Sequence, residues 1–293
     1  MDSSPRAHTG TLWLVSTPIG NLGDLSPRAA RTLGEVDLLV AEDTRHTLQL
    51  LTACGIRRAP GTLVSLNEQN ERARAPELVA RLLAGDSVAL VSDAGTPLMS
   101  DPGAALVAAA AHAGVAVSTV PGCCAAIAGL TMSALPTDRF CFEGFLPAKP
   151  AARRRRLEEL RQEPRTLVFY EAPHRIAETL ADMAALMGDA RPAVIARELT
   201  KKFETIYRDT LAGLAARATQ DENLARGEIV IVIEGAAGDA TSADDAEADR
   251  LLAILLAELP ASQAAKLAAQ ISGRGRRELF ARAVALQGRG NPA

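Results

Sequence analysis

Short runs of apolar and β-branched residues alternate along the first part of the chain with longer amphipathic or alanine-rich stretches. Runs such as "VDLLVA" and "VALVS" are almost wholly apolar, which is typical of strands that are covered on both faces. This alternation predicts an α/β fold with a doubly wound parallel sheet. The predicted strands are Thr11–Ser16, Val36–Ala41, Leu63–Leu66, Val88–Ser92 and Val115–Val120.

The second part of the chain shows the same kind of pattern with a different spacing. The predicted strands are Phe140–Phe145, Thr166–Tyr170, Ala193–Glu198, Glu204–Thr210 and Glu228–Ile233. The last three follow one another closely, so we expect part of this sheet to be antiparallel. We place the change of domain near Pro121-Gly122, with Pro136 as the alternative.

Residues that start and stop helices are clearest at Ser26-Pro27. Serine suits the N-cap and proline the first helical position, and we expect Gly34 just past the end of this helix.

The end of the chain has a different composition. The stretch "GAAGDATSADDAEAD" is typical of a linker, which we place at 237–248. Beyond it, Leu251–Leu259 is expected to be helical, and the following sequence predicts a helix, a glycine turn and a second helix. Between Ala261 and Ala293 there are six basic residues and one acidic residue. We therefore expect 249–293 to be a small basic helical domain, which either contacts nucleic acid or is a solvated helical hairpin.

Composition narrows the class of protein. The 293 residues suffice for two compact domains, or for one large domain with an appendage, and the net charge of −3 means that a nucleic-acid partner needs a local basic patch. The four cysteines form no C-x-x-C pair and the four histidines are scattered, so we expect neither a metal site nor a disulfide framework. No apolar run approaches the roughly 20 residues of a membrane span. The polar N-terminus lacks a signal-peptide core, so the cytoplasm is the expected location.

Four predicted strands end in polar segments rich in glycine, proline and small residues. Ligands of doubly wound sheets bind at the carboxyl ends of strands, so these segments are candidates for a binding site: 17–21, 41–47, 92–103 and 120–130. The most informative is "SDAGTPLMSDPG", which offers main-chain donors and acceptors to a ligand without long side chains between them. Two successive turns would explain fewer of its residues.

The segment "AEDTRHT" brings Glu42, Asp43 and Arg45 together at the end of a strand. These side chains could orient a polar substrate, or Asp43 or Thr44 could simply cap the next helix. The sequence has no P-loop, no G-x-G-x-x-G after a strand and no Ser-His-Asp set at recognisable spacing. Phosphate and dinucleotide chemistry is therefore not expected.

Eight segments together carry a resemblance to one family: "TPIGNLGD", "AEDTRHT", "LVSDAGTPLMSDPG", "VPGCCAA", "DRFCFEGFLPAK", "RTLVFYEAPHR", "ARELTKKFET" and "GEIVIVIEG". They occur in the same order as in the ribosomal small-subunit methyltransferase I family, which the chain resembles over about residues 11–236, with a less specific match in the helical tail. That family has the tetrapyrrole-methylase type of fold found in one class of S-adenosylmethionine (SAM) enzymes.

The resemblance implies two α/β domains, 11–121 and 122–236, with SAM in the cleft between them, usually in a homodimer. The implied reaction is methylation of the ribose 2′-hydroxyl of a cytidine in the decoding region of 16S rRNA, without a metal. By motif, the contacts with SAM fall on Pro18, Ala94, Gly95, Thr96, Met99, Cys124, Ala125, Tyr170, Glu171, Leu199 and Ile229. SAM has no phosphate, which accounts for the missing diphosphate-binding glycine pattern.

The chain departs from the family pattern in two places. Cys123 replaces the second proline of a Pro-Gly-Pro, so this loop should be less stiff. Asn67 and Gln69 stand where the family usually carries histidine, while Asn70 and Glu71 are kept, so this segment supplies no catalytic histidine.

Catalysis of such a transfer needs a group that accepts the proton of the hydroxyl, and a carboxylate within hydrogen-bond reach can do so. The candidates are Glu42, Asp43 and Glu171, with Arg45 or Lys201 orienting the substrate, and each could instead be a structural ion pair or cap.

RNA binding needs positive surface. We expect it at the run Arg153, Arg154, Arg155 and Arg156, and second at Arg274, Arg276 and Arg277, although a solvated helix start would also explain the run.

Two other functions remain open. A tetrapyrrole C-methyltransferase on the same fold usually has more glycine in the first loop and Gly-Asp-Pro where Gly95-Thr96-Pro97 stands. A non-catalytic RNA-binding or ribosome-assembly protein could retain the fold without the activity.

Overall fold

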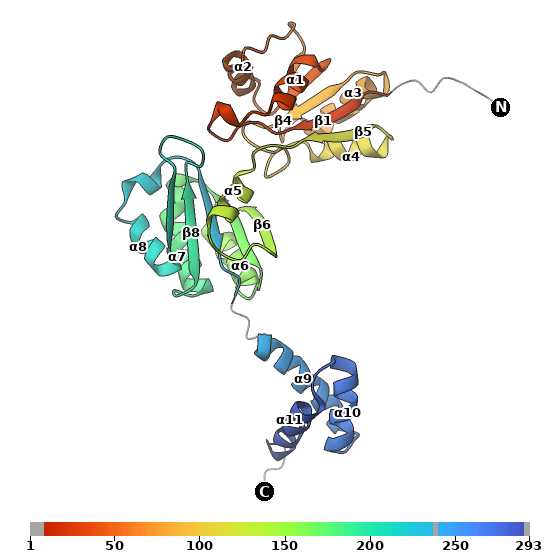
Figure 1. Ribbon diagram of the computed structural model, residues 1–293, viewed down its shortest axis with the longest axis vertical. Coiled ribbons are helices and arrows are strands. Elements are labelled where there is room, and N and C mark those ends of the chain that lie inside the picture. Colours follow the sequence, from red (N-terminus) through yellow and green to blue (C-terminus); the bar gives the residue numbers. More distant parts are fainter. Residues whose placement is uncertain (1–8, 237–239, 290–293) are drawn as a thin grey trace, which may run out of the picture. The chain divides into compact units, whose positions relative to one another are not determined.

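The computed structural model describes residues 9–236 and 240–289 (Figure 1). The chain divides into two compact units, Met1–Glu234 and Gly235–Ala293. The larger unit contains two five-stranded sheets with strand orders β3-β2-β4-β1-β5 and β6-β7-β10-β8-β9. Each strand predicted from the sequence is present, with each end as predicted or shifted by at most two residues.

The first sheet is parallel throughout, as its sequence pattern predicted. Its strands are β1 (Thr11–Val15), β2 (Leu38–Ala41), β3 (Leu63–Ser65), β4 (Val88–Val91) and β5 (Ala116–Val120). The helices of this part are η1 (Leu22–Asp24), α1 (Pro27–Glu35), α2 (Thr44–Ala53), α3 (Glu71–Leu83) and α4 (Ala104–His112). Buried residues of α3 and α4 cover one face and those of α1 and α2 the other, so the sheet is doubly wound.

The start of α1 is as predicted, because Ser26 Oγ accepts a hydrogen bond from the N–H of Ala29. Its end is not. Gly34 lies inside the last turn, and Val36 rather than Gly34 is the cap. The helix therefore runs past the glycine, and the strand that follows begins at Leu38 instead of Val36.

The second sheet is mixed, which confirms the expectation from the close spacing of its last strands. Its strands are β6 (Phe140–Phe145), β7 (Thr166–Glu171), β8 (Pro192–Arg197), β9 (Thr205–Thr210) and β10 (Ile229–Ile233). Only β6 and β7 pair in parallel. The helices of this part are α5 (Ala125–Met132), α6 (Pro150–Leu160), η2 (Pro173–Arg175), α7 (Ile176–Met187), α8 (Leu211–Ala218) and η3 (Glu222–Ala225).

Strand β10 shows how the period of two in a strand builds the two faces of this sheet. Ile229, Ile231 and Ile233 pack into the core formed with α6, α7 and α8. Val230 and Val232 point to the other face, where α5 packs. The chain leaves the first sheet at Val120 and is already packed on the second sheet in α5, so the passage between the sheets lies at 121–124.

The smaller unit consists of α9 (Ala240–Leu256), α10 (Ala261–Ser272) and α11 (Arg276–Arg289). Gly273 ends α10 in the left-handed conformation, which glycine adopts without strain, and this forms the expected turn between two helices. Of the stretch predicted as a linker, residues 237–239 lie outside the described residues, and α9 already begins at Ala240.

Candidate functional site

A cavity of about 340 Å³ in the larger unit is lined by segments from both sheets. They are the loops after β1 and β4, the start of α5, the ends of β6, β7 and β8, the β8–β9 loop and the start of β10. Most of the residues proposed to contact SAM lie in this lining, namely Ala94, Gly95, Thr96, Met99, Ala125, Tyr170, Glu171, Leu199 and Ile229. The structure thus brings together residues that are spread over most of the larger unit.

Two proposed contact residues lie just outside that lining. Pro18 is half-buried beside Ile19, which does line the cavity. Cys124 lines an adjoining cavity of about 410 Å³, together with Ile19, Cys123 and Thr200. Ile19 therefore separates the two cavities.

Hydrogen bonds hold three of the strand-end loops together. Thr17 and Gly95 exchange main-chain hydrogen bonds of 2.9 and 3.2 Å. The Thr96 hydroxyl donates to the carbonyl of Cys123 at 2.8 Å and lies 3.0 Å from the Ser16 hydroxyl. The first loop is thus one wall of a site formed by three loops.

Four residues other than glycine have positive φ in two of the loops that border the cavity. Leu98 and Ser100 have positive φ in the loop after β4, and Glu198 and Thr200 have positive φ in the loop after β8. Residues other than glycine adopt a positive φ only at an energetic cost, and residues strained in this way cluster at functional sites. The two loops are therefore held in shapes that the surrounding structure imposes.

Acidic side chains gather beside the cavity. Asp101 lines it, and burial raises the pKa of its carboxyl. Burial, followed by the negative charge of Asp101, raises the pKa of Glu42, which places the two carboxyls within electrostatic reach. Asp101 was not among the site residues predicted from the sequence, because aspartate before Pro-Gly is typical of a turn.

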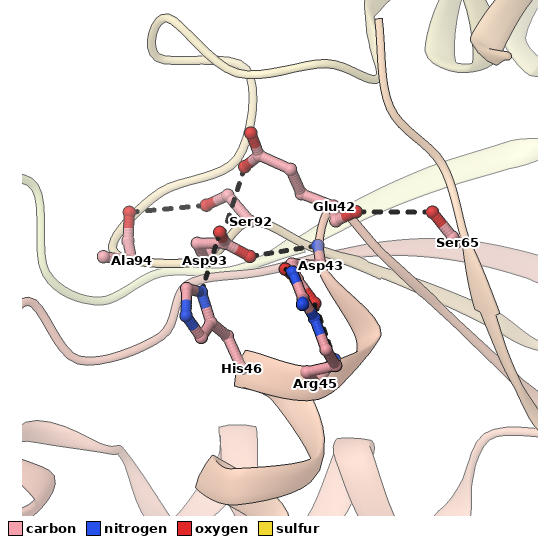
Figure 2. A network of polar contacts seen from close by, with 8 residues as sticks. All are labelled: Glu42, Asp43, Arg45, His46, Ser65, Ser92, Asp93 and Ala94. Atoms are coloured by element: carbon pink, nitrogen blue, oxygen red, sulfur yellow. Dashed lines mark hydrogen bonds and ion pairs between the residues drawn. The ribbon is translucent and has the colours of Figure 1, made fainter. Parts of the chain in front are cut away.

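Asp43 and Arg45 form an ion pair with each other at the start of α2 (Figure 2). The carboxylate of Asp43 accepts the main-chain N–H of Arg45 at 2.8 Å and its guanidinium at 2.6 Å, so Asp43 is the N-cap of α2. The hydrogen bond from the Arg45 side chain holds the pKa of Asp43 far below its usual range. A carboxylate with such a low pKa is a weak base.

Asp93 links this pair to the cavity loop. It accepts the N–H of Asp43 at 3.0 Å and lies 3.0 Å from Nδ1 of His46 (Figure 2). Its own N–H donates to Glu42 at 3.4 Å. The hydrogen bond with Asp93 raises the pKa of His46.

The structure places Glu171, a candidate base from the sequence, in a buried hydrogen-bond network. Its side chain is 1% exposed, and its carboxylate accepts hydrogen bonds from the hydroxyl of Thr179 at 2.7 Å, from its neighbour's N–H at Ala172 at 2.7 Å and from Arg175 at 3.1 Å. These contacts occupy both oxygens. Glu171 is therefore a buried anchor between β7 and α7.

The four arginines of the run on α6 differ in exposure and in their acidic partners. The side chain of Arg153 is 3% exposed, and its Nε lies 2.7 Å from Asp182 on α7, so this residue is not available to RNA. Arg154 also bonds Asp182, and Arg156 bonds Glu143 and Glu159. Arg155 has a side chain that is 83% exposed, with Glu159 3.8 Å away.

Lys201, a candidate for orienting the substrate, has structural partners, and so do Asn70 and Glu71, which the chain keeps from the family pattern. Lys201 lies 2.9 Å from Glu198 and 3.2 Å from Glu228, and Glu228 lines the cavity. Asn70 accepts the N–H of Asn67, and Glu71 accepts the N–H of Ala105 at the start of α4. The segment that replaces the family's histidines is therefore a turn that holds α4.

In the smaller unit Arg276 and Arg277 are exposed at the start of α11, while Arg274 pairs with Glu278. Arg282 bonds Asp249 on α9 at 2.8 Å. Arg276 and Arg277 thus lie near the turn between the last two helices, while the exposed Arg250 and Lys266 lie on α9 and α10.

Among residues 9–236 and 240–289, no group of three His, Cys, Asp or Glu side chains is arranged to hold a metal ion. Within the same described part, none of the helices has the length and apolar character needed to cross a membrane.

Two family models match the chain. Tetrapyrrole (Corrin/Porphyrin) Methylases matches residues 11–215, and RsmI C-terminal HTH domain matches residues 242–287. The fold also agrees with solved structures. The methyltransferase CobJ has a TM-score of 0.57 at 20% identity, over 78% of this chain and 95% of that one. A uroporphyrin-III C-methyltransferase from Thermus thermophilus, in complex with S-adenosyl homocysteine, has a TM-score of 0.51 at 19% identity, over 77% of this chain and 97% of that one.

Relatives with higher sequence identity point to a more specific family than the solved structures do. Ribosomal RNA small subunit methyltransferase I of Xylella fastidiosa is 56% identical, over 92% of this chain and 98% of that protein. The protein of the same name from Pseudomonas aeruginosa is 52% identical, over 96% of this chain and 99% of that protein. The chain therefore belongs to the ribosomal RNA small subunit methyltransferase I family and has the tetrapyrrole methylase fold.

Proposed function

We propose that the protein transfers a methyl group from SAM to the ribose 2′-hydroxyl of a cytidine in the decoding region of 16S rRNA, in the small ribosomal subunit. The observation that carries the proposal is the composition of the cavity. Its volume of about 340 Å³ suits a small-molecule ligand, for which about 300–1,000 Å³ is usual. It is lined by main chain, small side chains and apolar side chains.

The charges of the lining favour a cationic ligand. The lining contains Asp101, Glu171 and Glu228 and none of its residues is Lys, Arg or His. Glu171 is paired with Arg175 and Glu228 with Lys201, so Asp101 is the acidic group that a cationic ligand would meet. A phosphate would meet no positive side chain here, whereas the sulfonium and ammonium groups of SAM are complementary to carboxylates. This explains why a strand-end loop in this fold needs no phosphate-binding glycine pattern.

Individual residues have clear parts in holding such a ligand. Gly95 exposes the main chain of the loop after β4, and Leu199 and Ile229 supply apolar contacts. The hydroxyl of Tyr170 accepts the N–H of Ala126 at 3.2 Å, which fixes the start of α5 beside the cavity. Burial raises the pKa of Tyr170, so this hydroxyl stays protonated.

When bound, SAM supplies a methyl group on a sulfonium that is already activated for transfer. We assign the proton of the acceptor hydroxyl to Asp101. It lines the cavity, and a carboxylate whose pKa is raised takes up a proton more readily than an exposed one. As the 2′-oxygen forms its bond to the methyl carbon, the bond from that carbon to sulfur would break and leave the neutral thioether S-adenosyl homocysteine. The proton of the hydroxyl would pass to a carboxylate oxygen of Asp101. Burial, followed by the negative charge of Asp101, raises the pKa of Glu42, so a second carboxyl lies within electrostatic reach of the proposed base.

RNA would be held by positive charge outside the cavity. Arg155 and Arg156 line a groove that shares Phe145 with the cavity, so the exposed part of the arginine run lies close to the proposed site of transfer. Arg276 and Arg277 are the second contact, because the smaller unit matches a helix-turn-helix family model and helix-turn-helix units bind nucleic acid through the second helix. A homodimer and a cytoplasmic location belong to the same proposal.

The test uses purified protein, tritiated SAM and small ribosomal subunits from a strain that lacks the endogenous enzyme. We expect label in 16S rRNA from those subunits and none in subunits that already carry the modification. A parallel reaction with uroporphyrinogen III should give no labelled tetrapyrrole. Label in the tetrapyrrole and not in RNA would overturn the proposal in favour of carbon methylation. Calorimetry that detects no affinity for SAM would overturn it in favour of a non-catalytic protein.

A further inference from the structure

A bulge in strand β6 determines where Phe145 points. The pairing of β6 with β7 runs Phe142 with Val168, then Gly144 with Phe169 and Phe145 with Tyr170, so Glu143 is an extra residue in the strand. In a regular strand Phe145 would lie on the opposite face from Phe142, because side chains alternate. The bulge moves Phe145 to the face of Phe142 and Tyr170.

Ring contacts agree with this placement. The centroid of the Tyr170 ring lies 4.9 Å from the centroid of the Phe142 ring and 5.5 Å from that of the Phe145 ring. Gly144 has φ of +64°, a conformation that glycine adopts freely, and a Cβ there would lie 2.8 Å from Oγ of Ser100 in the cavity loop. The bulge is therefore fitted closely against the proposed SAM site.

Phe145 lines two hollows at once. One is the cavity proposed for SAM, and the other is a groove of about 280 Å³ that also contains Arg155, Arg156, Glu143 and Glu159. Phe145 is 54% exposed. A single exposed phenylalanine is ordinary, but one that a bulge directs to the rim of the proposed site is not.

The charges in the groove leave one arginine available. Arg156 lies 2.6 Å from Glu143 and 2.9 Å from Glu159, so these three charges largely satisfy one another. The ion pair of Arg155 with Glu159 is long, at 3.8 Å, and the side chain of Arg155 is 83% exposed. The groove thus presents an exposed aromatic ring next to a guanidinium that can bind an anion.

We infer that Phe145 stacks on an unpaired base of the RNA strand next to the acceptor ribose, and that Arg155 binds the phosphate of that nucleotide. An aromatic ring beside a positive charge is the combination that holds single-stranded nucleic acid. The inference rests on the proposed function, since it assigns a positioning role within that reaction. A methyl acceptor in folded RNA has to be presented to the cavity, and a stacked base fixes its position.

The experiment compares Phe145→Ala, Phe145→Trp and Arg155→Ala with the control Phe140→Ala. Phe140 is the exposed aromatic at the other end of β6 and does not line the cavity. The readouts are KM for small ribosomal subunits, the calorimetric Kd for SAM, and the sedimentation of the protein alone. Thermal melting confirms that each variant is folded.

We expect Phe145→Ala to raise KM for the subunits by about 5- to 150-fold, the range for loss of one stacked base. Phe145→Trp should restore most of the loss, and Arg155→Ala should raise KM with a weaker dependence on salt. Because Phe145 also lines the cavity, the Kd for SAM should rise as well, but by a clearly smaller factor than KM for the subunits. Phe140→Ala should resemble wild type.

Equal KM values for Phe145→Ala and Phe140→Ala would overturn the inference, as would an increase in the Kd for SAM as large as that in KM. Dissociation of a wild-type dimer by Phe145→Ala would assign the ring to contact between two copies of the chain and would overturn it too. These outcomes require that wild-type protein methylates the subunits. Absence of that activity would instead contradict the proposed function.

Discussion

Thr17 and Gly95, which are 78 residues apart, exchange two main-chain hydrogen bonds with N–O distances of 2.9 and 3.2 Å. This pair joins the loop after β1 to the loop after β4, and the two loops contribute Ile19 and Gly95 to the cavity. Gly95 has φ of +84°, and a Cβ there would lie 3.1 Å from Cγ2 of Ile19. The cavity therefore depends on a position where only glycine fits without strain.

Gly95→Ala should weaken SAM binding by about tenfold or more, because the added methyl group pushes against Ile19 and the backbone strain of about 1–2 kcal/mol disturbs the loop. Isothermal calorimetry measures the effect. Gly61→Ala is the matched control, since Gly61 has φ of +80° with no atom within 4 Å of the added Cβ. If both variants bind SAM as wild type does, the loop is not the binding wall that we describe.

Asp101→Asn should lower kcat by about 10²–10⁴-fold, since an amide cannot take the proton of the 2′-hydroxyl. Asp43→Asn should change kcat little, because its oxygen still caps α2 and its pKa already makes it a weak base. Single-turnover rates with saturating SAM measure this step. The reverse order, with Asp43→Asn inactive and Asp101→Asn active, would return Asp43 to the role of base.

The pH dependence of kcat/KM follows from the raised pKa of Asp101. The base must be ionised, so activity is full above this pKa and falls as pH decreases through it. Burial moves the pKa upward, and the acid limb should therefore lie above the ordinary value of about 3.9 for aspartate. A profile for wild type that stays flat to the ordinary aspartate range would contradict the assignment, and so would an acid limb that Asp101→Asn leaves unchanged.

Asp182→Ala should destabilise the protein by about 3–5 kcal/mol, because it leaves the buried guanidinium of Arg153 without its main partner. Arg155→Ala on the same helix should change the free energy of unfolding by no more than about 0.5 kcal/mol, since that side chain is exposed. Urea unfolding of both variants distinguishes the structural arginine from the exposed one. Similar stability for the two variants would mean that Arg153 is not held by Asp182 in solution.

Replacing Arg276 and Arg277 by alanine should reduce the salt dependence of binding to small ribosomal subunits. Each phosphate contact that is lost lowers the slope of log K against log salt by about 0.7–0.9. Filter binding at several salt concentrations gives the slope, and calorimetry should show unchanged affinity for SAM. An unchanged slope would remove the smaller unit from the RNA contact.

Local pattern in the sequence was sufficient for the strands, because apolar runs such as Val88–Val91 have to be buried on both faces of a sheet. It was also sufficient for the cap at Ser26, where the contacts are between near neighbours. Gly34 shows the limit of such rules, since a helix can continue through one glycine when the main-chain hydrogen bonds of its last turn are formed.

Roles that depend on distant partners could not be predicted. Arg153 and Glu171 had the residue types expected of an RNA contact and a base, but both are buried and hydrogen-bonded to α7, Arg153 to Asp182 and Glu171 to Thr179. Phe145 points to the cavity only because of a bulge that the alternation in "FCFEGF" does not reveal. Asp101 gains its importance from burial beside Glu42, which lies far away in the sequence.

Mapping the methylated nucleotide tests the central claim most directly. Small ribosomal subunits from a strain lacking the gene are incubated with wild-type protein and SAM, and nuclease fragments of the 16S rRNA are then analysed by mass spectrometry. The account predicts one added methyl group, on the ribose of a cytidine in the decoding region, which Asp101→Asn strongly reduces. A methyl group on a base, or at a position outside the decoding region, would contradict it.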